Sequence, residues 1–341
     1  MNIRSLVLAV GGFLAIGALS PAMAMDGVVA SIKPVYSLVA AVMGDTGSPE
    51  LIVEGAGSPH TYSLKPSQAR MLENAKLVFW IGHDLEAFLE KPLETLSHDA
   101  QVVALSKAEG LKFLELREGG TFEGHDHGHE GHDQDEHAEH EDHDAHGEEH
   151  ADHDHDHEGE EHAHHHGEEI DVHIWLDPRN AAAMVQAIAD ALAKADPGNA
   201  ETYLSNADLL TVSLSRLEDE IGEALAPVHT RSFIVFHDAY QYFEQRFGLH
   251  VAGSVTVNPE VMPGAERIAE IHAKVSEVNS VCVFSEPQFE PKILAAITEG
   301  TSTHSGTLDP LGASLEDGPN LYFTLMRNMA AEIRGCLAGE G

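Results

Sequence analysis

Histidine is the residue type in this chain whose abundance and spacing most clearly suggest chemistry. Sixteen of the 25 histidines fall between His125 and His166, mixed with acidic residues and glycine, and the other nine are scattered. Neutral imidazole and carboxylate groups are both zinc ligands. The crowded stretch predicts many weak, interchangeable sites, so a single specific site would have to come from scattered histidines.

Three of the scattered histidines stand at or beyond the ends of segments with strand character. His60 lies in the turn-rich loop GSPHTYSLKPS after ELIV, His173 lies in DVHIWLDP, and His237 ends SFIVFH. Ligands of open α/β sheets bind just past the carboxyl ends of strands. A solvated loop residue remains the alternative for His60. For His173, which strand periodicity places beside Trp175, the alternative is a buried core histidine.

Asp309 is a fourth candidate ligand, because GTLDPLG follows another short strand with an acid and a proline. Its alternative role is an Asx-turn next to Pro310. Three imidazoles with one carboxylate or water suit the four-coordinate, borderline-soft Zn²⁺, whereas manganese prefers more oxygen ligands. The predicted cofactor or cargo is therefore zinc.

A zinc hydrolase is the first rival interpretation, because three histidines with an open water position also hold catalytic zinc. The chain contains no H-E-x-x-H motif, and only Glu54 and Glu286 come into question as a general base. Glu286, in FSEPQFEP, is better explained by a loop role. We therefore predict a binding protein rather than an enzyme, with a zinc store acting through the insertion as a third possibility.

The elements that must position these residues follow a βα alternation. Helical patterns alternate with the strand-like segments GVVASI, ELIVEG, LVFWIG and QVVALS. The next segment is DVHIWL, which is followed by a helix that begins at Asp177-Pro178. A second βα series starts at SFIVF. This pattern predicts an α/β protein with two lobes, each with a mostly parallel sheet. A long apolar-periodic segment between the two series predicts a rigid helix that connects the lobes.

Domain boundaries follow from these patterns. The start of the chain has Arg4, a short apolar run and Ala22-Met23-Ala24, which together are typical of a cleavable signal peptide, so we expect an exported protein. Residues 120–169 contain almost no apolar side chains, which predicts disorder. The predicted division is a signal peptide at 1–24, an N-terminal lobe at 25–197 containing the 120–169 insertion, a connecting helix at 198–226 and a C-terminal lobe at 227–341.

The net charge of −38 is concentrated in the insertion. Residues 123–169 hold 20 of the 57 acidic residues and none of the 19 basic ones, so the remainder is only moderately acidic. Nucleic-acid binding needs clustered Lys and Arg, so we expect no nucleic-acid partner. No second apolar stretch is long enough to span a membrane, and we expect a soluble monomer. Cys282 and Cys336 either form a disulfide or remain as two buried thiols.

Several of these segments resemble the motifs of a known family. The chain resembles the metal-binding proteins of bacterial zinc uptake ABC transporters. The similar segments are GSPHTYSLKPSQARMLENAKLVFWIG, DVHIWLDPRNA, FIVFHDAYQYFEQRFGL, PGAERIAEI and LDPLG. The resemblance covers essentially the whole mature chain. It implies a periplasmic zinc-binding protein with two α/β lobes around a rigid helix and with the metal site in the cleft between the lobes. Such a protein delivers the metal to a membrane ABC permease.

The resemblance also implies site residues. His60, His173 and His237 fall on the family's ligand positions, and manganese-specific relatives typically carry Glu where His237 stands. Some zinc members use a Glu immediately before the first histidine, but here that residue is Pro59, so Asp309 or water would be the fourth ligand. Cys282 and Cys336 resemble a disulfide of Gram-negative zinc members.

The insertion would then act as an accessory, low-affinity zinc collector. Its candidate ligands are His125, His127, His129, His132, His153, His155, His157, His164, His165 and His166.

Overall fold

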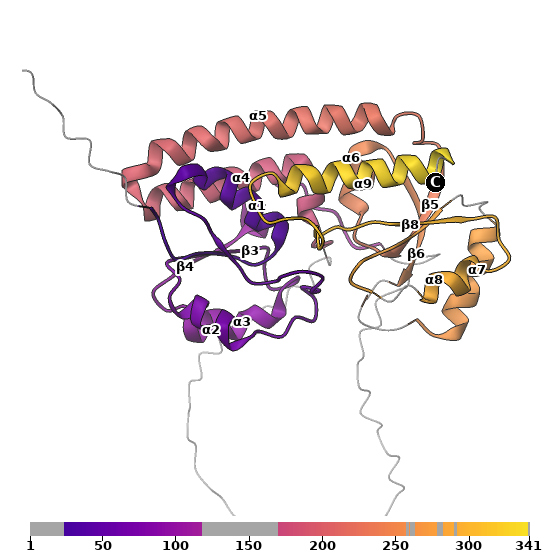
Figure 1. The fold of residues 1–341 in the computed structure, drawn as a ribbon, viewed down its shortest axis with the longest axis horizontal. Helices are drawn as coiled ribbons and strands as arrows, with labels where there is room; N and C mark the ends of the chain where they lie inside the picture. Colours follow the sequence, from indigo (N-terminus) through magenta and orange to yellow (C-terminus); the bar gives the residue numbers. More distant parts are fainter. Residues whose placement is uncertain are drawn as a thin grey trace, which may run out of the picture.

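The computed structural model describes residues 24–117, 170–256, 259, 263–277, 282–289 and 292–339. It confirms the predicted α/β class: two lobes each contain a four-stranded parallel sheet, and a layer of long helices runs across both (Figure 1). Residues 1–23 of the predicted signal peptide and the whole predicted insertion lie outside the described residues. No helix among the described residues has the length and apolar character needed to cross a bilayer.

The first sheet has the strand order β2-β1-β3-β4. Every residue of β1 is buried, and so are the first three of β3, because helices cover the sheet on both faces. Its strands are β1 (Val28–Ala30), β2 (Glu50–Leu51), β3 (Leu77–Trp80) and β4 (Gln101–Ala104).

The second sheet has the equivalent order β6-β5-β7-β8, so β5 and β7 are its central strands. Neighbouring parallel strands end at the same edge of the sheet, and the residues that follow β5, β7 and β8 are therefore brought together there. The strands are β5 (Ser232–His237), β6 (His250–Thr256), β7 (Cys282–Ser285) and β8 (His304–Thr307).

The helices form layers around the sheets. In Figure 1, α1, α4, α5 and α9 lie along one side of the molecule, and the pairs α2/α3 and α7/α8 lie on the opposite side of the first and second lobe. The helices are α1 (Lys33–Met43), α2 (Pro66–Glu73), α3 (Glu90–Leu96), α4 (Pro178–Ala195), α5 (Ala200–Leu225), α6 (Gln241–Phe247), α7 (Ala265–Glu277), α8 (Lys292–Thr298) and α9 (Leu321–Ala338).

Helices α4 and α5 follow directly from local sequence signals. The Asp177 side chain accepts a hydrogen bond from the backbone N–H of Arg179, and Pro178 occupies the first turn, which together begin α4. Along the 26 residues of α5, the buried side chains recur every three or four positions and form one apolar stripe. That stripe packs on α4, α1 and α9. The buried stripe residues are Tyr203, Ala207, Leu210, Leu214, Leu217, Ile221 and Leu225.

Contacts between the lobes are built around Trp175. Its indole Nε1 donates to the carbonyl of Pro310 at 2.9 Å, and its own carbonyl accepts from the Tyr322 hydroxyl at 2.7 Å. A single hydrophobic cluster includes side chains from both sheets and from α5. A smaller cluster, which includes Ile271 and Ile297, lies between α7, α8 and the second sheet.

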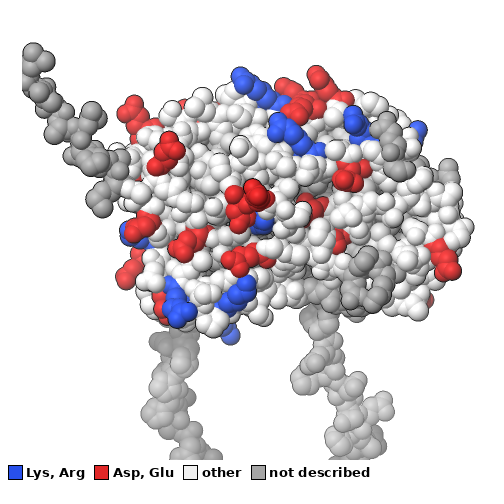
Figure 2. Space-filling model, viewed as in Figure 1, with Lys and Arg blue, Asp and Glu red and all other residues white. Residues whose placement is uncertain are grey.

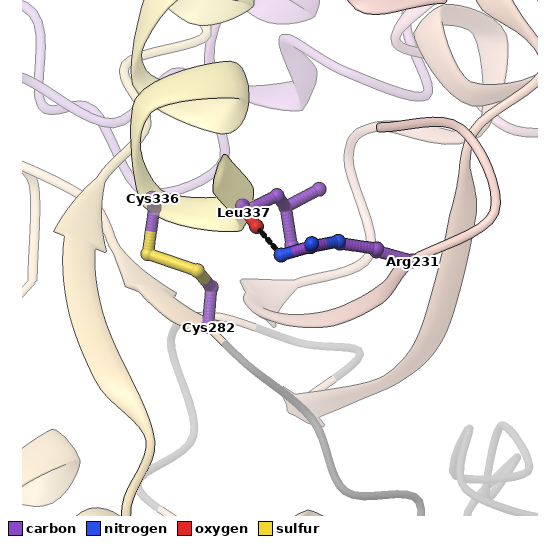
Figure 3. The surroundings of a disulfide bond; sticks show 4 residues. All are labelled: Arg231, Cys282, Cys336 and Leu337. Atoms are coloured by element: carbon purple, nitrogen blue, oxygen red, sulfur yellow. Dashed lines mark hydrogen bonds between the residues drawn. A yellow bond between two sulfur atoms is a disulfide. The ribbon is translucent and has the colours of Figure 1, made fainter. Parts of the chain in front are cut away.

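The two cysteines form a disulfide, which confirms the first of the two alternatives. Cys282 at the start of β7 and Cys336 in α9 have Cα atoms 6.2 Å apart (Figure 3). Beside it, the Arg231 guanidinium donates to the carbonyl of Leu337. The bond closes a loop with a sequence separation of 54 residues, and cross-links of this size typically contribute about 2–4 kcal/mol to folding. It fixes the last helix to the second sheet.

The described residues on either side of the 118–169 gap meet on helix α6. Glu115 and Ile170 form an antiparallel bridge, and the backbone N–H of Asp171 donates to the carbonyl of Leu114 at 2.9 Å. The Tyr242 hydroxyl of α6 joins both segments, since it accepts from Leu114 N–H at 3.1 Å and donates to the Asp171 carbonyl at 2.8 Å. The described residues that flank the insertion therefore lie side by side at the junction of the lobes.

Charged side chains are spread over the face seen in Figure 2. Acidic side chains occur over both lobes, and the basic ones lie in small separate groups. This face of the described chain therefore offers no broad basic area for a nucleic-acid backbone.

Candidate metal centre

Three histidines from distant parts of the chain converge between the lobes. One ring nitrogen from each of His60, His173 and His237 can be chosen so that all three lie within 4.8 Å of one another. The ring centroids are 5.1 Å apart for His173 and His237, 5.5 Å for His60 and His173, and 5.9 Å for His60 and His237. Among the described residues this is the one group of His, Cys, Asp and Glu side chains found with the spacing of a metal site.

Each histidine is held by a different kind of element. His60 lies in the loop between β2 and α2, where its backbone N–H donates to the Ser58 hydroxyl at 3.3 Å. His237 is the last residue of β5, as the sequence predicts. His173 immediately precedes a short 3-10 turn at Ile174–Leu176.

The strand predicted for DVHIWL is wrong. Ile170 makes only an isolated bridge, and the residues after His173 form the 3-10 turn instead. Ile174, Trp175 and Leu176 are all buried, so successive side chains do not alternate between two different environments as they would in a strand. These residues are apolar because the cores of both lobes surround them, and not because they pair with a neighbouring strand. The Trp175 ring does lie beside His173, with the centroids 5.4 Å apart.

Two buried carboxylates orient two of the histidines. The Asp171 carboxylate lies 2.7 Å from Nδ1 of His173, and the Glu286 carboxylate lies 2.7 Å from Nδ1 of His237. A neutral imidazole whose Nδ1–H donates to a carboxylate presents an unprotonated Nε2. The two Nε2 atoms face each other at 3.3 Å. Two lone pairs at this distance repel each other unless a proton or a cation lies between them.

The sequence analysis missed the part played by Asp171 and Glu286. A signal for Glu286 was present: it follows β7, as His237 ends β5, and β5 and β7 are neighbours in the sheet. Glu54, the other acid considered as a general base, is exposed and pairs with Lys65 at 3.1 Å. Neither Glu286 nor Glu54 is arranged as a free general base.

The surroundings shift the pKa values of His60 and His237 in opposite directions. Burial lowers the pKa of His60 well below its ordinary value, and charge interactions with the neighbouring imidazoles of His173 and His237 lower it further. Burial also disfavours the charged form of His237, but the charge and hydrogen bond of Glu286 outweigh it and raise the pKa of His237.

The histidines line a very small cavity. Its free volume is about 10 Å³, roughly the space needed by the centre of one water-sized particle. Aromatic and apolar side chains, including Trp175 and Phe289, enclose it together with Gln288. The cavity has room for a bare ion or one water.

Comparison with known proteins identifies the family. The family model described as ZnuA, a periplasmic zinc-uptake complex component A, matches residues 28–336. The chain belongs to the ZnuA family. A high-affinity zinc uptake system protein ZnuA from Brucella suis biovar 1 is 52% identical over 99% of both chains, and one from Yersinia pestis is 36% identical over 92% of both. A crystal structure of ZnuA matches with a TM-score of 0.68 and 24% identity, over 92% of this chain and 99% of that one.

Membership of the ZnuA family confirms that the chain is a periplasmic component of zinc uptake, a transport protein rather than an enzyme. The similarity in fold extends to the solved ZnuA structure, which agrees with the two-lobed architecture of Figure 1.

Asp309 lies outside the three-histidine group of this ZnuA-family chain. Its Oδ1 accepts from the backbone N–H groups of Leu311 and Gly312 at 3.1 and 2.9 Å, and its Oδ2 accepts from that of Ala313 at 2.6 Å. These contacts correspond to the Asx-turn alternative considered from the sequence. The accessory histidines of the insertion, from His125 to His166, lie outside the described residues.

Proposed function

We propose that the protein captures one Zn²⁺ with the imidazoles of His60, His173 and His237 and delivers it to a membrane ABC permease. The observation that carries this proposal is the pair of Nε2 atoms of His173 and His237, 3.3 Å apart, each left unprotonated by a carboxylate on Nδ1. Two nitrogens bound to one tetrahedral zinc at about 2.05 Å stand about 3.3 Å apart. The observed spacing therefore suits the metal.

The chemistry of the donors supports zinc over manganese. All three groups are neutral nitrogen donors in a largely apolar cavity, and Mn²⁺ prefers oxygen. We infer that water supplies the fourth position, because the Asp309 carboxylate already accepts three backbone N–H groups. Zinc enters here as cargo, so a closed site with no room for an organic substrate serves the function.

The organisation of the whole chain fits this proposal. We propose lobes at 25–197 and 227–341, joined by the helix at 198–226, in a monomer exported after cleavage of residues 1–24. The histidine-rich insertion is proposed as an accessory, low-affinity collector; Leu114 and Asp171, which flank it, both contact Tyr242 of α6. A rival function as a zinc store would depend on the insertion alone.

Zinc binding by a variant lacking residues 124–168 tests the proposal. A capture protein keeps one tight site in this variant, whereas a store loses nearly all its bound metal. In the same background His60→Ala, His173→Ala and His237→Ala each remove one of three ligands, so we expect each to weaken zinc binding by about 100-fold or more in a chelator competition. His250→Ala, an exposed histidine at the start of β6, is the control. Parent-like affinity in all three ligand variants would overturn the assignment.

A further inference from the structure

Gln288 lines the same cavity as the three histidines but has no role in the site described above. It lies two residues after Glu286, just beyond the end of β7. Its side-chain Nε2 donates to Oδ1 of Asp309 at 3.3 Å. Its Oε1 is shielded from solvent and accepts no hydrogen bond from the described residues. A buried amide oxygen normally has a donor, so this one requires an explanation.

The orientation of the Gln288 amide is determined by Asp309. An ionised carboxylate only accepts hydrogen bonds, so the amide NH₂ must be the end that faces it. The carboxylate itself is held by the backbone N–H groups of Leu311, Gly312 and Ala313. Asp309 thereby fixes which end of Gln288 is the acceptor, and Oε1 is left for a donor that arrives with the ligand.

We propose that Gln288 is a positioning residue for the fourth zinc ligand, and that its Oε1 accepts a hydrogen bond from the water bound to the metal. This inference rests on the proposed function, because the donor is a water that completes the shell of three histidines. The other side-chain oxygens of the cavity lining already have partners, since Ser58 accepts from the backbone N–H of His60 and Glu286 contacts Nδ1 of His237. Asp309 acts on the metal-bound water through Gln288 and is not itself a ligand.

An acceptor at this place also determines what the fourth ligand can be. A metal-bound water has protons to donate to Oε1, whereas an anion such as azide has only lone pairs to present and is repelled. Gln288 therefore favours water over small anions. Replacing it by a residue of similar size without an acceptor removes this preference.

Azide binding to the cobalt-loaded full-length protein tests the inference. With less than one equivalent of Co²⁺, the tight site is filled first, and the visible spectrum of the ion reports its nitrogen ligands and the arrival of azide. We expect Gln288→Leu to bind azide about tenfold more tightly than the wild type and to hold zinc several-fold more weakly. Gln288→Met, which keeps the length of the side chain, serves as a second variant if the leucine variant does not fold.

Gln245→Leu is the matched control, because Gln245 is an exposed glutamine of α6 that contacts Lys112 away from the cavity. It should leave azide and zinc affinity unchanged. A wild-type cobalt spectrum without histidine coordination would refute the proposed function itself. Normal coordination, with azide affinity in both Gln288 variants within twofold of the wild type, would overturn only the role of Gln288, since a loss of packing alone creates no preference for an anion.

Discussion

Removal of the Glu286 carboxylate should weaken zinc binding although Glu286 is not itself a proposed ligand. Its oxygen lies 2.7 Å from Nδ1 of His237, and only 3% of the residue is exposed. The contact fixes the proton of His237 on Nδ1, turns the ring toward the cavity and makes Nε2 a stronger donor. It also places a negative charge behind the metal, in surroundings with little water to screen it.

The size of the effect follows from these two contributions. Loss of a carboxylate behind a metal-binding histidine typically costs 10- to 100-fold in affinity, or about 1.4–2.7 kcal/mol. Glu286→Gln keeps an oxygen that can accept from Nδ1–H and loses only the charge, so we expect about a tenfold loss. Glu286→Leu loses both the charge and the acceptor, and about a 100-fold loss is expected.

A chelator competition at pH 7.5 with less than one equivalent of zinc measures both variants. Glu86→Gln is a suitable control, because Glu86 is equally buried but lies in the first lobe, where it contacts Ser31 and the backbone N–H of Gly82. The control should bind zinc like the parent. If folded Glu286→Leu binds within twofold of the parent, the Glu286 carboxylate does not support the site and the reasoning is refuted.

Three further predictions concern stability and pH. Arg117 donates to Asp238 and Glu244, which are both largely buried, so Arg117→Ala should lower the free energy of unfolding in urea by about 3 kcal/mol. The exposed pair of Arg327 and Glu220 is the comparison, and Arg327→Ala should lower it by less than about 1 kcal/mol. Equal losses in the two variants would contradict this difference. Burial raises the pKa of Glu86 from 4.5 to about 7, so the folded state holds this proton more tightly and wild-type stability should fall as pH rises from about 4.5 through 7. Glu86→Gln should therefore gain stability relative to the wild type between pH 5 and 8, by up to about 3 kcal/mol, and a constant difference over that range would exclude the effect. Protonation of the histidine-rich insertion near pH 6.5 should lower the zinc stoichiometry measured by calorimetry between about pH 7.5 and 5.5, and an unchanged stoichiometry would contradict it.

The α/β class could be predicted from the sequence pattern, whereas the set of His60, His173 and His237 depended on the family resemblance, because the pattern alone left other roles open for His60 and His173. The βα alternation appears in local hydrophobic patterns, and the rule that ligands gather at strand ends requires no knowledge of strand order. His237 shows this most clearly, since it ends the central strand β5.

The partners of the histidines could not be predicted in the same way. Glu286 reaches His237 only because β7 lies next to β5, and the order β6-β5-β7-β8 is a property of the folded sheet. The strand assigned around His173 failed for a related reason. An apolar run enclosed by two lobes has the same composition as a buried strand, and only the tertiary contacts distinguish the two.

The bridge between Glu115 and Ile170 has a consequence for how this protein can change over time. Because these two backbone positions are adjacent, residues can be added or deleted between them in the sequence without moving either lobe. By the loop-closure relation, doubling the number of residues in a flexible loop costs only about 0.6 kcal/mol. The described fold therefore sets only a weak limit on the length of the sequence between Glu115 and Ile170.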